Sequence, residues 1–342
     1  RYEDSRVLSL ITLPNADLMP EKTYTTDLGL SMDLFSRLTL EATWYKRRTE
    51  DALLDVPIPS SNGFTTLKRN IGVLDNSGLE LSASVKVIDT SDWQLRLQAS
   101  MAYNRNKVVD LYYADKIYSS SESLVPDYEV GKSYDMLYGP ESLGINPLTG
   151  YPVFRSSDGS VKQANEVLTA ADMKALGHLT PPYTGSINFS LSYKAFDLDA
   201  DFYYVHGGVQ PYNYSYVRSR DNANFNAVRG QVSDMWFSAG DENKTYPNPF
   251  NTSTQADNNL TLYTNSRQVG KSDYLRLSML SLRYKVPYRF LQRHFPVFKY
   301  ATFALQGSNL LTWTSYKESD PESGTLAGTT QPVITFSMNV TF

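Results

Sequence analysis

Cysteine is absent from the 342 residues of this sequence, and histidine occurs only three times, at His178, His206 and His294. The lack of cysteine excludes disulfide frameworks, thiolate metal sites and cysteine nucleophiles. The sequence contains neither a GxSxG nor an HExxH motif, and nothing in it places two acids across a cleft as a glycosidase requires. We therefore predict no enzyme activity, no catalytic residues, no metal site and no cofactor.

A strong excess of positive or negative charge and long apolar runs are also missing. Acidic residues number 36 and basic residues 32, for a net charge of -4, so no basic field is present to attract nucleic acid. No apolar run approaches the ~20 residues that a membrane-spanning helix requires. A β-barrel remains possible, because its strands alternate between lipid and lumen and keep the mean hydropathy low.

Aromatic residues and strict alternation are what the sequence does contain. It has 25 Tyr, 15 Phe and 4 Trp, yet its mean hydropathy is -0.39. Apolar and polar residues alternate with period two in nine segments, which predicts β-strands with one apolar and one polar face. The segments cover residues 23–34, 37–46, 78–87, 93–104, 186–194, 196–204, 274–286, 299–309 and 334–342. In the seventh the phase slips near Met279, which predicts a β-bulge.

The connections between these segments alternate in length. Short returns follow Leu34, Val87 and Lys194, and long links cover 49–75, 106–182, 207–272 and 311–331, with 286–298 as a longer link on the short side. A soluble β-sandwich also alternates, but compact soluble domains rarely contain structureless links beyond ~15 residues. The pattern predicts an all-β fold, an antiparallel transmembrane β-barrel with long extracellular loops and mostly short periplasmic turns.

Outward aromatic residues fall at the ends of the predicted strands, as expected for interfacial girdles. The long-loop ends carry Trp44, Tyr103 and Tyr204, and the short-turn ends carry Trp93, Tyr193, Phe196, Tyr284 and Phe342. An open sheet of nine strands has two edges, and hydrocarbon offers no hydrogen-bond partner to the backbone N–H and C=O groups along them. We therefore expect residues 1–342 to be the C-terminal portion of a larger barrel, whose last strand ends at the periplasmic rim.

Five stretches, in order, resemble SusC/RagA-type TonB-dependent transporters of the Bacteroidota. They are NIGVLDNSGLELSASVKVIDTSDWQLRLQASMAYNRNKV, GPESLGINPLTGYPVF, PPYTGSINFSLSYKAFDLDADFYYVHGGVQPYN, SDYLRLSMLSLRYKVP and ATFALQGSNLLTWTSYKESDPES. Asn146 stands where the family pattern has Asp. The resemblance runs from about residue 20 to Phe342.

The resemblance implies an outer-membrane barrel of about 22 strands, with the N-terminal plug and earlier strands absent from this chain. It also implies active import of oligosaccharides or peptides, a SusD-like lipoprotein lid, and coupling to TonB-ExbB-ExbD through the missing N-terminal region. Two alternatives stay open. One is a SusC-like barrel that serves as a structural or assembly component without transport, and the other is a secreted sugar-binding β-protein.

Two groups of residues are candidates for contact with a ligand or a lid. Aromatic and basic loop residues offer flat apolar faces and hydrogen-bonding groups: Tyr203, Tyr212, Tyr214, Tyr216, Arg218 and Trp236. Polar residues expected to face the lumen are Arg96, Asp197, Asp199 and Asp201. The alternative roles are ordering of the loops for the first group and a solvated wall against the plug for the second. Alternate residues of a strand lie about 7 Å apart, too far for neighbouring aspartates to share one cation easily. The three aspartates therefore do not predict a cation site.

Overall fold

A computed structural model describes residues 13–59, 61, 63–120, 123–163, 166, 168–212, 232–247, 264–317, 320–322 and 330–342. Its main element is one antiparallel sheet with the strand order β1-β2-β3-β4-β11-β12-β15-β16-β17. The strands are β1 (Lys22–Leu34), β2 (Leu38–Pro57), β3 (Thr66–Asp89), β4 (Trp93–Asp110), β11 (Tyr183–Tyr193), β12 (Phe196–His206), β15 (Tyr274–Lys285), β16 (Tyr300–Thr314) and β17 (Val333–Thr341). All nine predicted segments lie in these strands, so the all-β prediction is confirmed.

Smaller elements fill the long connections. A four-stranded sheet has the order β10-β7-β8-β9, and two pairs join β5 to β6 and β13 to β14. Their bounds are β5 (Lys116–Tyr118), β6 (Pro126–Glu129), β7 (Met136–Ile145), β8 (Pro152–Arg155), β9 (Val161–Gln163), β10 (Met173–His178), β13 (Val209–Pro211) and β14 (Val269–Lys271). Among the helical elements are η2 (Ala170–Asp172), η5 (Ser266–Gln268) and α3 (Tyr288–His294). No helix in the described part of the chain is long and apolar enough to cross a membrane.

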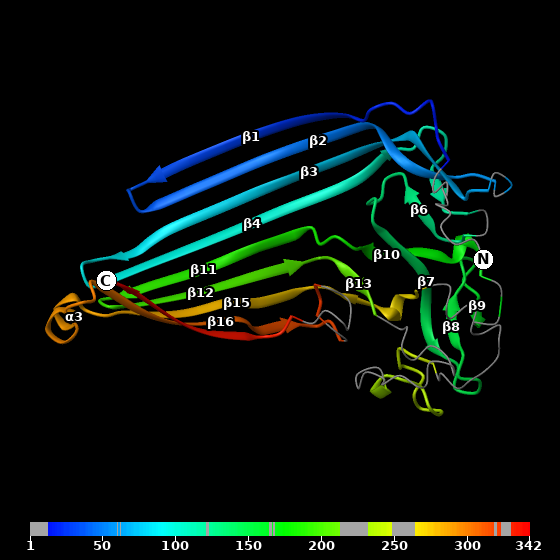
Figure 1. Ribbon diagram of the computed structural model, residues 1–342. Helices are drawn as coiled ribbons and strands as arrows, with labels where there is room; N and C mark the ends of the chain where they lie inside the picture. Colours follow the sequence, from blue (N-terminus) through cyan, green and yellow to red (C-terminus); the bar gives the residue numbers. More distant parts are fainter. Residues whose placement is uncertain are drawn as a thin grey trace, which may run out of the picture.

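Short and long connections lie at opposite ends of the main sheet. The turns after β1, β3 and β11 gather at one end with α3 and the C-terminus, and the small sheets lie at the other end (Figure 1). In the first turn, Phe35 and Ser36 have φ angles of 54° and 56°, and the Arg37 N–H donates to the Leu34 carbonyl at 3.1 Å. Two left-handed residues match the right-handed twist of a hairpin. The predicted separation of short turns from long loops is therefore confirmed.

The predicted bulge in β15 is also present. Its pairing with β16 shifts between Leu277 and Met279, and the facing shift on β12 lies between Asp201 and Phe202. Relative to β12 the extra residue is Ser278, whereas β16 places two residues, Asn309 and Leu310, opposite it. Because one inserted residue reverses the side-chain alternation, the apolar residues on either side of the bulge stay on the same face of the sheet.

The prediction of a long link at 49–75 is wrong. Strand β2 continues to Pro57 and β3 begins at Thr66, so these residues extend the hairpin. The β2–β3 register shifts around Ala52, next to Asp51 with a φ of 57°, and this break hides the strands from a period-two search. Beyond the break, an apolar cluster packs the extended hairpin against the next connection: Leu54, Ile71, Val108, Leu111 and Ile117.

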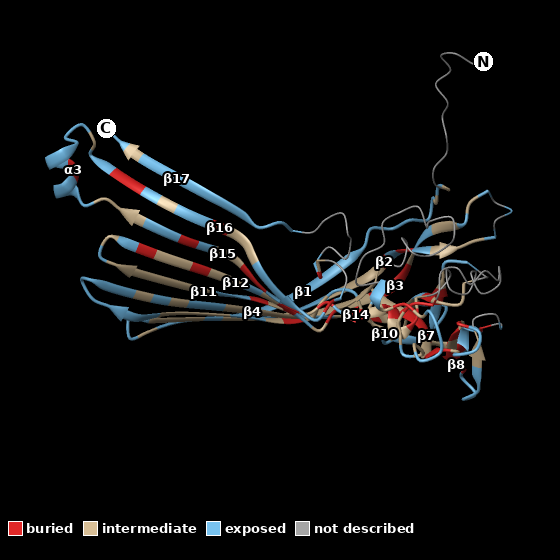
Figure 2. Cartoon of the chain, turned by 90° about the horizontal axis from the view of Figure 1, so that it is seen from below, coloured by how far each residue is buried: buried red, intermediate tan, exposed pale blue. Residues whose placement is uncertain are grey.

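Large apolar side chains are exposed along the main sheet. Leu28 is 65% exposed and Ile334 is 73% exposed, and β1 and β17 are exposed along almost their whole length (Figure 2). The extensive contacts of each strand are with its neighbours in the same sheet. A soluble sandwich would bury these side chains between two sheets, so the secreted β-protein does not fit the fold.

Aromatic side chains form a row across neighbouring strands at the short-turn end. Trp93 lies opposite Tyr193, which lies opposite Phe196, which lies opposite Tyr284. The Trp93 and Tyr193 ring centroids are 4.0 Å apart, and those of Phe196 and Tyr284 are 4.8 Å apart. At the other end, Trp44, Leu79, Tyr103 and Tyr183 form a second row. The apolar face of the sheet therefore lies between two aromatic rows.

Candidate functional site

The polar side chains occupy the other face of the sheet, because successive strand residues point to opposite sides. The register places one polar residue of each strand directly opposite a polar residue of the neighbouring strand. The resulting row, from β2 to β15, is Glu41, Ser82, Ser100, Ser186, Tyr203 and Arg276. The Ser82 hydroxyl donates to Glu41 at 3.2 Å, and the Ser100 and Ser186 hydroxyls are 2.8 Å apart.

This row, apart from Arg276, lines a hollow of about 320 Å³ on the polar face, which we call the polar-face hollow. The polar side chains around it are Glu41, Thr43, Glu80, Ser82, Ser100, Thr184, Ser186 and Tyr203. Hydroxyl groups donate and accept hydrogen bonds, and ionised carboxylates only accept. The lining therefore suits a neutral or cationic ligand that carries many N–H or O–H groups and has an apolar face for the tyrosine ring.

The three predicted lumenal aspartates form separate hydrogen bonds across the β11–β12 hairpin. Asp197 accepts from Ser192 at 2.8 Å and Asp199 accepts from Ser190 at 2.7 Å. Asp201 accepts from the amide of Asn188. This ladder joins the two strands, and no group of three or more acids or histidines that could hold a metal occurs among the described residues.

The fourth predicted lumenal residue, Arg96, lies on the polar face nearer the short turns. It is opposite Lys86 and Ser190 and lines a separate hollow of about 420 Å³ with Gln94 and Ser192. Arg96 therefore lies in a different hollow from Tyr203, beside Lys86 and Asp89.

A buried ion-pair cluster at Arg276 was not identified from the sequence. Arg276 is 5% exposed, and its Nη2 donates to both Asp320 carboxylate oxygens at 2.8 Å. Its Nη1 donates to Glu322 at 2.6 Å and its Nε to Thr312 at 3.1 Å. The guanidinium also lies 4.9 Å from the centre of the Tyr274 ring. The signal in the sequence was an arginine in YLRL at a polar-face position, together with the two acids of SDPES.

This cluster holds residues 320–322 against the end of β15. Burial raises the pKa of Asp320, but hydrogen bonds from the Glu322 backbone and Thr330, and then from Arg276, outweigh that effect and hold its pKa below the usual value. The acid therefore stays ionised beside Arg276 throughout the neutral range.

The predicted loop residues separate into two places. Tyr203 lines the polar-face hollow, with its ring 6.1 Å from that of Tyr274. Tyr212 packs against Met235 and Tyr246, and the Trp236 backbone N–H donates to the Tyr246 carbonyl at 2.8 Å. Tyr212 therefore packs on this apolar pair, Trp236 is joined to it through its backbone, and Tyr203 lies in β12. The other three candidates, Tyr214, Tyr216 and Arg218, lie outside the described residues.

Asp172 fixes the small sheet at the end with the long connections. It is 1% exposed and accepts from Ser156 at 2.7 Å, the Ser157 amide at 2.8 Å and Lys162 at 3.0 Å. The Thr169 amide and hydroxyl donate to it at 2.7 and 2.9 Å. Burial raises the pKa of Asp172, but these five donors outweigh burial and hold its pKa far below the usual range. Asp172 thereby ties the turn after β8 to β9 and to the start of η2.

An exposed apolar face bounded by aromatic rows, a polar face with a hydrogen-bonding hollow, and folded connections at one end define the wall of an outer-membrane β-barrel. The family described as TonB dependent receptor-like, beta-barrel matches residues 7–310. The chain belongs to this family of outer-membrane proteins, which are receptors and transporters and not enzymes.

Known relatives agree with this assignment. The chain is 29% identical over 336 residues to TonB-dependent receptor P3 of Formosa agariphila, covering 92% of the chain and 32% of that protein. It is 28% identical over 169 residues to TonB-dependent receptor SusC of Bacteroides thetaiotaomicron, covering 45% of the chain and 17% of SusC. The structure of the RagAB peptide transporter matches with a TM-score of 0.75 and 27% identity, covering 92% of the chain and 34% of that structure's chain. The chain thus spans about a third of the length of TonB-dependent receptor P3 and of the matched RagAB chain.

Proposed function

We propose that the chain forms part of the wall of a SusC-like TonB-dependent transporter that imports oligopeptides or oligosaccharides across the outer membrane. The observation that carries this proposal is the polar-face hollow, with its hydroxyls, two carboxylates and Tyr203 ring. Peptides and sugars both present many N–H or O–H donors beside apolar surfaces. The likeness to a transporter described as acting on peptides supports the same class of cargo.

We further propose that residues 1–342 form the C-terminal arc of a larger barrel whose plug and earlier strands lie outside this chain. Strands β1 and β17 form the two edges of the nine-stranded sheet. Hydrocarbon offers no hydrogen-bonding partner to an open strand edge, so barrels in membranes close on themselves. Additional strands would join these edges, and the polar face would then enclose the plug.

A SusD-like lipoprotein would cover the end with the long connections, and TonB-ExbB-ExbD would act through the plug region. Large side chains on that end of the molecule favour a protein contact there, because Tyr113 and Leu148 are exposed. Copurification of a SusD-like lipoprotein with the full-length receptor tests this part of the proposal. Its absence after gentle extraction would argue against a lid.

Uptake by cells that express the full-length receptor tests the transport function. Deletion should abolish growth on one peptide or glycan source, and Tyr203→Ala should raise the substrate concentration for half-maximal uptake about two- to tenfold, the value of an aromatic contact. Tyr203→Phe should retain most uptake. Tyr24→Ala, on the apolar face, is the matched control and should behave as the parent.

The opposite results separate the two surviving hypotheses. Normal growth of the deletion strain on every peptide and glycan source would refute import and favour a structural or assembly role. Impaired uptake in the deletion strain with no effect of Tyr203→Ala would keep import but remove the polar-face hollow from the ligand path.

A further inference from the structure

A cationic pocket of about 350 Å³ lies where β4 continues past the start of β11. Its positive side chains are Arg105, Lys107 and Lys132, and Tyr103 and Tyr183 lie at its lower edge. The two tyrosine rings are 4.8 Å apart and belong to the aromatic row at the end with the long connections. The pocket therefore begins at the level where the apolar face of the sheet ends.

Arg105 and Lys107 share the face of Tyr103. The β3–β4 register runs without a shift from Leu79 opposite Tyr103 to Asp75 opposite Lys107, so alternate residues of β4 keep to one side. Lys132 is held beside them by backbone hydrogen bonds of 2.8 Å that join Val108 to Lys132 and to Gly131. Arg105 and Lys107 thus lie on the outward side of the wall, and Lys132 lines the same pocket.

Nearby acids offset these cations only in part. Within the described residues, no carboxylate lies in ion-pairing distance of Arg105, Lys107 or Lys132. Asp75, opposite Lys107, is 3.9 Å from Lys46, and Glu129, whose charge also acts on Lys132, is 3.3 Å from Lys116. Asp135, next to the pocket, accepts from the Thr180 amide at 2.6 Å and from the Ser133 hydroxyl. The pocket therefore retains an excess of positive charge that favours an anion.

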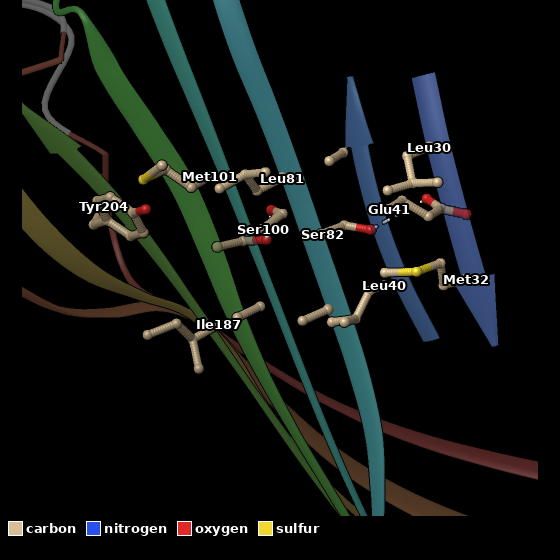
Figure 3. A pocket seen from close by; sticks show the side chains of 14 residues that line it. Leu30, Met32, Leu40, Glu41, Leu81, Ser82, Ser100, Met101, Ile187 and Tyr204 are labelled. Carbon is tan, nitrogen blue, oxygen red and sulfur yellow. Dashed lines mark hydrogen bonds between the residues drawn. The ribbon is translucent and has the colours of Figure 1, made fainter. Parts of the chain in front are cut away.

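A mostly apolar hollow of about 450 Å³ lies below the tyrosine pair, and Figure 3 shows the side chains that line it, the polar ones of Glu41, Ser82 and Ser100 among them. Small side chains of three neighbouring strands, Ala42, Ala83 and Ala99, lie within it. Larger side chains surround them, namely Leu30, Met32, Leu40, Leu81, Met101, Ile187 and Tyr204. Met101 is the next outward residue below Tyr103, about 7 Å along β4. Pocket, tyrosine pair and hollow therefore form one continuous surface along β3, β4 and β11.

We propose that this surface binds one phosphorylated lipid of the outer leaflet, with its headgroup phosphate in the cationic pocket and an acyl chain in the apolar hollow. Interfacial tyrosines mark the headgroup level of a bilayer, which places the three cations at the depth of lipid phosphates. Basic pockets at that level recognise anionic headgroups. The hollow faces hydrocarbon, where acyl chains are the molecules available to fill an apolar groove.

Binding of fluorescent monophosphoryl lipid A to the detergent-solubilised full-length receptor tests the proposal. Each removed cation should weaken binding about fivefold, so Arg105→Gln with Lys107→Gln should lose about 25-fold. Ala99→Leu should also weaken binding, because it fills the hollow without removing charge. Lys86→Gln with Lys299→Gln removes two positive charges elsewhere and should leave affinity unchanged. Heat-modifiable gel migration should show that every variant remains folded.

Competing ligands distinguish a lipid from other sources of phosphate. Dephosphorylated lipid A should bind much more weakly than the phosphorylated probe, and inorganic phosphate should fail to compete at similar concentrations. Equal binding of the dephosphorylated lipid would overturn the role of the cations, and competition by inorganic phosphate alone would reassign the pocket to a free anion. Unchanged affinity in both the charge variant and Ala99→Leu would refute the site.

Discussion

Replacing Asp320 by asparagine should release residues 320–322 from the wall, because it removes the charged partner of a buried arginine. The Asp320 side chain is 8% exposed and that of Arg276 is 6% exposed, and two hydrogen bonds of 2.8 Å join them. Asp320→Asn keeps the shape of the side chain and leaves Arg276 with Glu322 and Thr312. The substitution therefore isolates the charge of one carboxylate.

The magnitude follows from burial. A hydrogen bond to a charged group contributes about 1.5–3 kcal/mol, and about 2 kcal/mol corresponds to a roughly 30-fold larger open population. Glu322 also contacts Arg276, at 2.6 Å, but it is 58% exposed. An exposed pair contributes about 0.2–1 kcal/mol, so Glu322→Gln should raise the open population no more than about fivefold.

Hydrogen exchange at the backbone amides of Glu322 and Thr330 measures this opening, because both N–H groups donate to Asp320. Exchange should accelerate roughly 30-fold in Asp320→Asn and much less in Glu322→Gln. Amides in the centre of β11 provide the internal reference and should not change. Equal acceleration in the two variants, or none in Asp320→Asn, would refute the argument from burial.

Three further outcomes follow from the described contacts. Asp172→Asn should accelerate exchange in β8 by about 30-fold or more at neutral pH, since it loses a charged acceptor with five donors. In the parent, the depressed pKa of Asp172 means that its stabilisation is fully present above the ordinary value of 3.8 and is lost as pH falls further; protection factors in β8, which correct for the intrinsic exchange rate, that stay constant down to pH 2 would contradict this. Gly185→Ala should reduce the yield of heat-modifiable barrel, because the new Cβ would lie 2.2 Å from the Ser100 carbonyl oxygen and 2.5 Å from the Tyr204 hydroxyl. Wild-type yield of that variant would show that the strands can separate to accommodate a methyl group.

Alternation predicted the strands where the two faces of the sheet meet different solvents. Segments such as 93–104 and 196–204 carry that signal because lipid selects one face and water the other. The outer halves of β2 and β3 carry no such signal, since beyond Ala52 they pack against a neighbouring connection. The prediction of a long link at 49–75 therefore failed because this part of the hairpin does not have one face in lipid and the other in water.

The site was less accessible to sequence reasoning. The Arg276 cluster joins residues 44 and 46 positions apart, and such a contact depends on how the last long connection folds. Likewise, the role of the three aspartates depends on the β11–β12 register, which sets a serine or asparagine opposite each one. Tyr203 and Tyr212 were grouped as loop candidates, but Tyr203 lies within β12, whereas the ring of Tyr212 packs beside Tyr316.

The bulge at Ser278 divides β15 into two halves, and the alternation of inward and outward side chains changes phase between them. Receptor chimeras that exchange extracellular halves between relatives must therefore transfer the bulge intact with one half. A splice that kept Ser278 but replaced the bulge by regular strand pairing would turn Leu280 and Leu282 toward the water-filled interior and present Arg283 to the membrane.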